Sequence, residues 1–257
     1  MCALRQVYRG MPAPGPDASG MIREPFLFRQ TFATILADDP EHVVAAREGM
    51  IRARQVLEAQ IARDPFFQMT FDPYVPDSGE SIIRRMADAS KKAGVGPMAA
   101  VAGAIAWAGV ESMTDAGAVF GVIDNGGDIA LISDRPVRVG IHAAEALLSN
   151  RIAFVVPPQD TILGICTSSA SVGPSVSFGI ADAVTVFSYD VALADAWATS
   201  VCNQIRLQDH SVLDRINRNE VVGVLAIMGD TLVKWGDLPP IVPAVVDEQL
   251  ISAGDRL

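Results

Sequence analysis

One segment, GVGPMAAVAGAIAWAGVESM at residues 94–113, limits the possible folds more than any other part of the chain. Its length suits a helix, and it carries apolar or small residues on every side, so the helix must be buried on every side. Small residues four positions apart, Ala99 with Gly103 and Ala102 with Ala106, would let another backbone approach closely. The segment therefore predicts a central helix surrounded by the other elements of the chain.

Amphipathic segments and turn-bounded runs of β-prone residues surround this helix in the sequence. Helices are predicted at residues 40–64, 80–93, 191–206 and 212–218. Strands are predicted at residues 26–39, 118–124, 128–133, 136–140, 152–157, 162–166 and 181–189, with a closing hairpin over 221–236. Because hairpin-type turns join the strands, we expect an α+β fold with antiparallel or mixed sheets flanked by helices. No repeat or linker divides residues 1–257, which are expected to form one domain or two closely packed lobes.

Composition narrows the classes of function. The net charge of -10, from 20 Lys and Arg against 30 Asp and Glu, would repel a phosphate backbone, so no nucleic acid partner is expected. Three scattered cysteines suit a reducing compartment. The N-terminus MCALRQVYRGMPAPGP lacks the apolar run of a signal peptide, and no stretch is long enough to cross a bilayer, so we expect a cytoplasmic protein without a membrane partner. With 50% hydrophobic residues, an apolar surface and a homo-oligomer are expected.

The helix predicted at residues 191–206 carries the first candidate site. Asp195, Thr199 and Asn203 recur at every fourth position, so they lie on one stripe of the helix. A carboxylate one turn before a hydroxyl offers oxygen ligands to a hard cation such as Mg²⁺, which keeps several waters for a bound phosphate. In the alternative interpretation, the helix dipole favours Asp195 near the first turn and the stripe faces water.

Two loops offer donors to a phosphorylated ligand. The NGGD turn at residues 125–128 presents backbone N–H groups to an anion, although the same residues suit an ordinary hairpin turn. The loop at residues 167–177 is rich in hydroxyl donors, although serine-rich surface loops are common. The candidate ligand-binding residues are Asn125, Gly126, Gly127, Asp128, Thr167, Ser168 and Ser169.

Two further residues have alternative interpretations. Ala-Asp-Ala tripeptides on both sides of the strand at 181–189 suggest that Asp182 and Asp195 form a carboxylate pair, unless Asp182 only caps a loop. Covalent catalysis at Cys166 is not expected, because no histidine shows a triad signature with it. Cys166 closes an apolar strand and is expected to be a buried small side chain.

Four motifs, VGPMAAVAGAIA, NGGDI, CTSSASVGPSVSFGIADAVTV and LADAWATS, follow one another in this order between about Tyr8 and Leu238. Together they resemble an uncharacterised prokaryotic family within the ApbE-like superfamily, whose best-known members are the FAD:protein FMN transferases. The resemblance implies an ApbE-like fold and a site for FAD, FMN or another nucleotide together with Mg²⁺. By the same resemblance, the NGGDI turn would lie beside that site.

The resemblance also assigns the metal ligands. In those transferases Mg²⁺ is held by an Asp, by a Thr one helical turn later and by a backbone carbonyl near a Gly/Ala-rich helix. Asp195 and Thr199 match this pattern, and the carbonyl would come from around Ala99 or Ala100.

The chain departs from the transferases at two places. They carry a Lys in the Gly/Ala-rich segment, where this chain has Met98-Ala99-Ala100-Val101, and they carry a His-x-x-Asp-Pro motif, which the serine-rich loop replaces. Two functions are therefore considered. One is a Mg²⁺-dependent transferase that acts on a phosphorylated small molecule by phosphoryl, nucleotidyl or flavin transfer. The other is a non-catalytic ligand-binding or assembly protein on the same scaffold.

Overall fold

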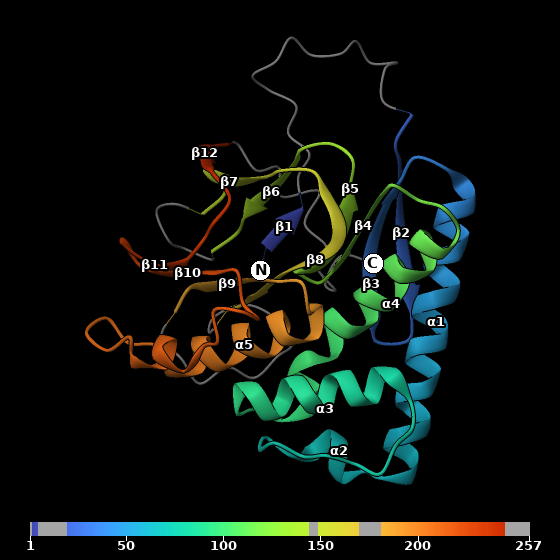
Figure 1. The fold of residues 1–257 in the computed structure, drawn as a ribbon, viewed down its shortest axis with the longest axis horizontal. Helices are drawn as coiled ribbons and strands as arrows, with labels where there is room; N and C mark the ends of the chain where they lie inside the picture. The colour runs from blue at the N-terminus through green and yellow to red at the C-terminus, as the bar shows by residue number, and fades with distance from the viewer. Residues whose placement is uncertain (1, 5–19, 144–148, 170–180, 245–257) are drawn as a thin grey trace.

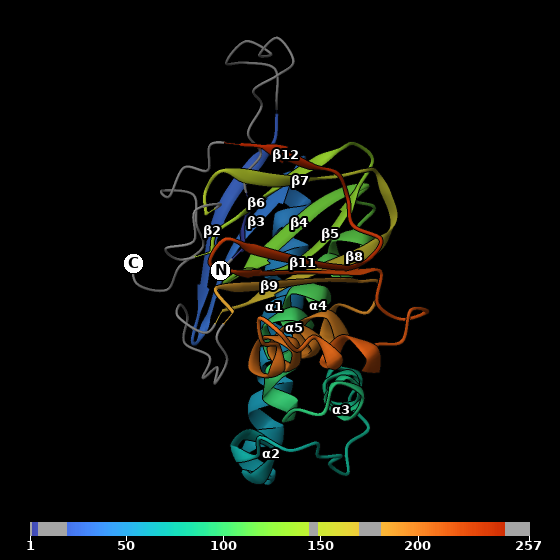
Figure 2. The same cartoon turned by 90° about the vertical axis from the view of Figure 1, so that its left-hand side faces the viewer.

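The computed structural model describes residues 2–4, 20–143, 149–169 and 181–244, and their elements form three layers (Figures 1 and 2). Helices cover one face of an eight-stranded sheet, and a four-stranded sheet covers the other face. A large hydrophobic core lies between the helices and the eight-stranded sheet, and a second core lies between the two sheets. The fold is therefore α+β, as the sequence predicted.

Both sheets are antiparallel throughout the described strands. The eight-stranded sheet has the order β11-β10-β9-β8-β5-β4-β3-β2, and the four-stranded sheet has the order β1-β6-β7-β12. The strands of the large sheet are β2 (Ile22–Phe28), β3 (Thr31–Ala37), β4 (Phe120–Asn125), β5 (Asp128–Ser133), β8 (Gln159–Ser168), β9 (Ala183–Ser188), β10 (Gly223–Met228) and β11 (Thr231–Gly236). Those of the small sheet are β1 (Cys2–Leu4), β6 (Val137–Ile141), β7 (Ile152–Val156) and β12 (Ile241–Pro243).

The four long helices follow the predicted segments closely, whereas the short helix after the first of them was not predicted. The helices are α1 (Pro40–Arg63), α2 (Phe66–Met69), α3 (Ser81–Ala93), α4 (Val101–Asp115) and α5 (Val191–Gln204), with the 3₁₀ helices η1 (Pro97–Ala100) and η2 (Ser211–Arg215). Asp39 caps α1 by accepting a hydrogen bond from the backbone N–H of Glu41 at 2.7 Å. Within the described ranges no single helix meets the length and hydropathy of a membrane span, while α3 and residues 97–115, bent by 108°, meet them only together.

The central helix predicted at residues 94–113 is α4, which is preceded by η1. It packs against α1, α3, α5 and the strands β4 and β5, and none of its residues before Asp115 is exposed. Glycines allow this packing, because a Cβ on Gly109 would lie 2.3 Å from Cδ1 of Ile123. The expectation of a buried central helix is confirmed.

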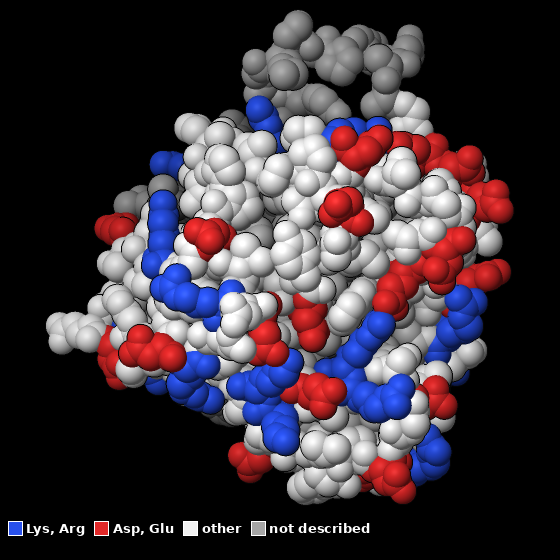
Figure 3. Space-filling model, viewed as in Figure 1, with Lys and Arg blue, Asp and Glu red and all other residues white. Residues whose placement is uncertain are grey.

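Charged side chains cover the outer stripe of α4. Both guanidinium nitrogens of Arg85 donate to Glu111 at 2.7 Å, and the guanidinium lies 3.9 Å from the centre of the Trp107 ring. On the face shown in Figure 3, Lys and Arg gather over the helical half and are interspersed with Asp and Glu. The outer stripe of α4 is therefore shielded by ion pairs rather than by apolar residues.

Two predictions about secondary structure were wrong. The single strand predicted at residues 26–39 is part of the hairpin of β2 and β3, which turns at Arg29 with a φ of 57°. No glycine or proline lies at this turn, so the apolar pattern looked continuous. The helix predicted at 212–218 is instead the 3₁₀ helix η2, which ends at Arg215. The exposed Asn217 lies beyond its end.

Candidate functional site

Asp195 lies where α5 crosses the start of α4. Its Oδ2 accepts a hydrogen bond from the backbone N–H of Gly103 at 2.8 Å, and only 7% of the residue is exposed. A Cβ on Gly103 would lie 2.8 Å from the carbonyl oxygen of Val191 and 2.9 Å from Cβ of Asp195. The glycine therefore permits the close crossing that buries the carboxyl group, and the interpretation in which this side chain faces water is wrong.

The NGGD turn lies against the same end of α4. Asn125 pairs with Asp128 across the β4–β5 turn, in which Gly126 and Gly127 have φ values of 70° and 104°. The side-chain amide of Asn125 donates to the carbonyl oxygen of Ala102 at 3.0 Å. The turn is thus an ordinary hairpin turn in its backbone, and it also reaches the residue next to Gly103.

Asp128 connects this turn to β8. Its Oδ1 accepts from the backbone N–H of Thr167 at 3.2 Å, and it lies opposite Cys166 in the sheet. The thiol of Cys166 contacts the carbonyl oxygen of Val191 at 3.6 Å, which leads back to α5 one turn before Asp195. The contacts therefore form a closed ring that joins β5, β8, α5 and the start of α4.

The carboxyl groups in this ring favour the protonated form. Burial raises the pKa of Asp195 to about 7, although hydrogen bonds from the backbone of Gly103 and Ala102 act to lower it. Burial also raises the pKa of Asp128 well above its usual range, and the charge of Asp195 raises it further. Asp128 keeps partial solvent contact as a residue, but its carboxyl group is turned inward against β8.

Cys166 shares this environment. Burial, followed by the charges of Asp128 and Asp195, raises the pKa of its thiol well above the usual value. A protonated, fully buried thiol is a poor nucleophile. The expectation that Cys166 is a buried small side chain is confirmed.

The remaining candidate residues lie around the ring to different degrees. Thr199 follows Asp195 by one turn of α5 and is half-buried. The hydroxyl of Thr167 instead points to the opposite face of β8, toward the small sheet, where it shares a 2.8 Å hydrogen bond with that of Thr185. Ser168 and Ser169 are buried at the end of the described part of this loop, and the positions 170–177 that were also considered lie outside the described residues.

Asp182 does not pair with Asp195. Its Oδ2 accepts from the backbone N–H of Gly229 at 2.6 Å, so it caps the turn between β10 and β11. The loop-capping alternative is confirmed. The carboxylate that interacts electrostatically with Asp195 is Asp128 rather than Asp182. The charge of Asp195 raises the pKa of Asp128, and both charges raise the pKa of Cys166. The sequence did not indicate this relation. In the described part of the chain, no group of three or more His, Cys, Asp or Glu side chains is placed to hold a metal ion.

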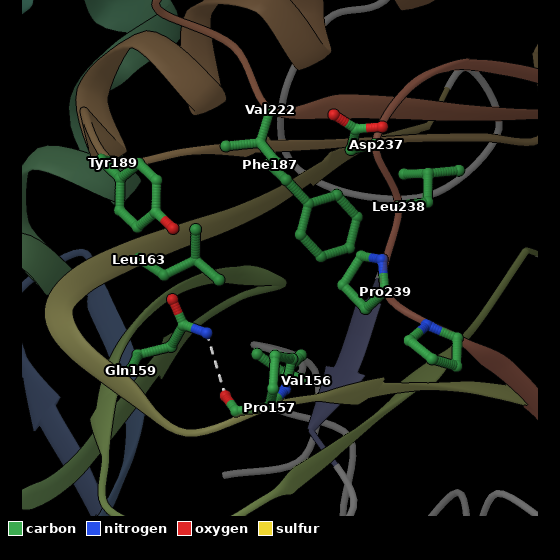
Figure 4. A pocket seen from close by; sticks show the side chains of 11 residues that line it. Val156, Pro157, Gln159, Leu163, Phe187, Tyr189, Val222, Asp237, Leu238 and Pro239 are labelled. Atoms are coloured by element: carbon green, nitrogen blue, oxygen red, sulfur yellow. Dashed lines mark hydrogen bonds between the residues drawn. The ribbon is translucent and has the colours of Figure 1, made fainter.

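An open groove of about 290 Å³ lies elsewhere, near the edge of the two sheets (Figure 4). Leu163, Phe187 and Val222 line its apolar part, and Gln159, Tyr189 and Asp237 contribute polar groups. None of the lining residues belongs to the ring around Asp195. The groove and the carboxylate site are therefore separate features.

Comparison with known proteins places the chain in a family. The family model described as "AbpE bacteria" matches residues 30–235. The chain belongs to this family. A UPF0280 protein of Methanoregula boonei is 66% identical over 238 residues, which cover 92% of this chain and 100% of that protein. A UPF0280 protein of Methanoculleus marisnigri is 62% identical over 234 residues, which cover 91% and 96% of the two chains.

The fold is also similar to that of a solved structure. The apo form of the flavinyl transferase ApbE from Pseudomonas stutzeri superposes with a TM-score of 0.52 and 14% sequence identity, covering 91% of this chain and 98% of that chain. At this identity the likeness shows the fold alone. Together with the family match, it confirms the predicted ApbE-like fold and the predicted relation to an ApbE-like family.

Proposed function

We propose that this protein binds a phosphorylated small molecule, a flavin or another nucleotide, together with Mg²⁺ held at Asp195 and Thr199. The observation that carries the proposal is the buried carboxyl group of Asp195, which faces the start of α4 beside the Asn125 turn. Burying a carboxylate without a cationic partner is costly. A bound divalent cation would offset that cost.

The residues present fit Mg²⁺, which prefers oxygen ligands and retains water. Asp195 offers a carboxylate, and Thr199 offers a hydroxyl one turn later on the same helix. A backbone carbonyl from around Ala99 or Ala100, in η1, would complete the set, and η1 packs against α5. The site uses no nitrogen or sulfur ligand in this assignment, as is typical of magnesium.

When bound, Mg²⁺ would neutralise charge on a diphosphate. The chain's own residues would orient the ligand through the 125–128 turn and through the hydroxyl groups of Ser168 and Ser169. The ApbE-like fold and its similarity to the flavinyl transferase ApbE of Pseudomonas stutzeri support a flavin as the ligand. If the protein is an enzyme, a Mg²⁺-dependent phosphoryl, nucleotidyl or flavin transfer is the reaction class that this arrangement supports.

One observation favours a second candidate, a non-catalytic binding or assembly protein. Asp195 already accepts the N–H of Gly103 in the first turn of α4, where a carboxylate stabilises a helix without any ligand. In that case the carboxyl group would tie α5 to α4, and the scaffold would have no metal.

Calorimetric titration separates the two candidates. Mg²⁺ is titrated into the wild-type chain and into Asp195→Ala, alone and with FAD, FMN or ADP. We expect metal-dependent nucleotide binding in the wild type and its loss in Asp195→Ala. Asp182→Ala is the control, because that aspartate caps a turn outside the ring. Binding of none of these compounds by the wild type would favour the second candidate.

We further propose that the protein acts in the cytoplasm as a homo-oligomer. The apolar composition supports this state, as do large exposed apolar side chains such as Phe66, Met69 and Phe71. Light scattering at micromolar concentration tests it, and a monomeric mass would contradict it.

A further inference from the structure

Two carboxylates reach the start of α4 from independent elements. Asp195 belongs to α5 and binds the N–H of Gly103, while Asp128 begins β5 and pairs with Asn125, whose amide binds the carbonyl of Ala102. Both series of contacts therefore end on adjacent residues of α4, Ala102 and Gly103. The resemblance and the spacing assign a cation to only one of these carboxylates.

Strand alternation shows which side chains face this place. Ile165 and Ile129 belong to the core between the two sheets, whereas Cys166 and Ala130 belong to the core beneath the helices. Side chains two positions apart point to the same face of a strand. Ser168 therefore points to the helical face together with Cys166, as does Asp128, which lies directly opposite Cys166.

Ser168 supplies an observation independent of the carboxylates. Its hydroxyl oxygen is buried and has no hydrogen-bond partner among the residues that the structure describes, and the whole residue is 7% exposed. Buried hydroxyl groups in native proteins are almost always hydrogen-bonded. An unpartnered hydroxyl on the same face as two carboxylates indicates that a polar ligand belongs there.

The charge around the carboxylates has the same implication. Burial raises the pKa of the carboxyl group of Asp190, which caps α5, while the nearby charges of Lys92 and Arg85 act to lower it. Asp195 instead accepts a hydrogen bond from the backbone N–H of Gly103, and no Lys or Arg among the described residues forms an ion pair with it. A cation from outside the chain would supply the counter-charge that Asp195 lacks among the described residues.

We infer that Asp128 is a second carboxylate ligand of the cation at Asp195, and that the hydroxyl of Ser168 binds the water or phosphate oxygen next to that cation. This inference rests on the proposed function and extends it. It gives the divalent cation ligands from both β5 and α5, so that the cation ties the central strands to the helical layer. The phosphorylated ligand would then lie between the NGGD turn and the end of β8.

The test uses Mn²⁺ alone as the probe, with binding measured by electron paramagnetic resonance on the full chain. The variants are Asp128→Asn, Asp195→Asn and Ser168→Ala, and Asp182→Asn is the matched control. We expect Asp128→Asn to weaken Mn²⁺ affinity about tenfold or more, Ser168→Ala to weaken it less, and Asp182→Asn to leave it unchanged. Asn keeps the size of Asp, removes the charge and replaces one carboxylate oxygen by an NH₂ group, which cannot bind a cation.

A second measurement does not depend on how well a variant folds. In the wild-type chain, titration with diamagnetic Mg²⁺ should shift the side-chain carboxyl ¹³C NMR signals of Asp128 and Asp195 and should leave that of Asp182 in place. If Mg²⁺ shifts the Asp195 carboxyl signal but not that of Asp128, and Asp128→Asn binds Mn²⁺ normally, the inference is overturned while the proposed function stands. If the wild type binds no Mn²⁺, both fail.

Discussion

The two faces of the eight-stranded sheet differ in what they bury. The face against the small sheet buries a hydrophobic cluster in which Phe154 and Phe187 meet edge to face with centroids 4.8 Å apart. The face against the helices buries apolar residues as well, but Asp195, Cys166 and Ser168 lie among them. The first face is built for stability. It also buries polar groups, but these are hydrogen-bonded to each other or to the local backbone, such as Thr167 with Thr185 at 2.8 Å and Asp124 with the N–H of Gly127 at 2.8 Å. The helical face instead gathers two carboxyl groups whose pKa values burial raises, those of Asp195 and Asp128, which is typical of a functional site.

The largest expected effect is on the face against the small sheet. Phe154→Ala should lower the free energy of unfolding by about 3–5 kcal/mol, because it removes a fully buried ring and its partner contact with Phe187. Mn²⁺ affinity of the folded fraction should stay at the wild-type value. Urea denaturation and metal titration check the two statements.

Phe154→Leu serves as the milder control for that experiment. It keeps most of the buried volume and should cost less stability than the alanine variant. A loss of Mn²⁺ affinity that grows from the Leu to the Ala variant would show that the two faces are coupled, and the contrast between them would have to be given up.

The second effect lies at the crossing of α4 and α5. Gly103→Ala should lower the free energy of unfolding by about 1–3 kcal/mol, because the new methyl group would lie 2.8 Å from the backbone oxygen of Val191. To relieve this contact, α4 and α5 would have to move apart. That movement would displace Asp195 and weaken Mn²⁺ binding. Gly79→Ala is the control, since no atom lies within 4 Å of a Cβ there. Equal stability of the two variants would contradict the tight crossing.

Local signals explain why much of the fold was predictable from the sequence. Asp39 followed by Pro40 marks the start of α1, and the hairpin glycine Gly229 marks the turn between β10 and β11. These features act over a few residues and need no knowledge of the rest of the chain. The hairpin at Arg29 was missed because its turn lacks such a residue.

The site was only half predictable, for a topological reason. The stripe of Asp195 and Thr199 follows from helical periodicity, but the position of Asp128 beside Cys166 depends on sheet order. Between β5 and β8 the chain contributes β6 and β7 to the other sheet and then returns to pair with β5. No local sequence pattern predicts that β8 pairs with β5. The sequence therefore could not place the carboxylate of Asp128 opposite the strand that ends at Ser168.

The third prediction uses pH to separate the two faces. The folded chain holds the pKa of Asp195 near 7, above the value of about 3.9 in an unfolded chain. The stabilising effect of the protonated carboxyl is therefore fully present below about pH 4 and is lost as the pH rises through 7. In metal-free buffer, Asp195→Asn should become progressively more stable than the wild type between pH 4 and 7.

Urea denaturation at several pH values, with EDTA present, measures this difference. The charge of Asp195 also raises the pKa of Asp128, so the difference between the two chains contains the contribution of Asp195 and the part of the Asp128 shift that Asp195 causes. Parallel stability curves for the two chains across the range would show that the carboxyl group of Asp195 is not desolvated in solution. Saturating Mg²⁺ should flatten the wild-type curve, because a bound cation favours the ionised form.

The smallest effect is expected at Asp182, the carboxylate that the sequence could not distinguish from a site residue. Asp182→Ala removes the 2.6 Å hydrogen bond from the N–H of Gly229. It should lower the free energy of unfolding by about 1 kcal/mol, because the exposed N–H can form a hydrogen bond with water instead. Because Asp182 lies outside the ring, the pH dependence and the Mn²⁺ affinity should match those of the wild type. A shift in either quantity would mean that Asp182 is coupled to the ring around Asp195. The distinction between the turn-capping aspartate and the site residues would then be wrong.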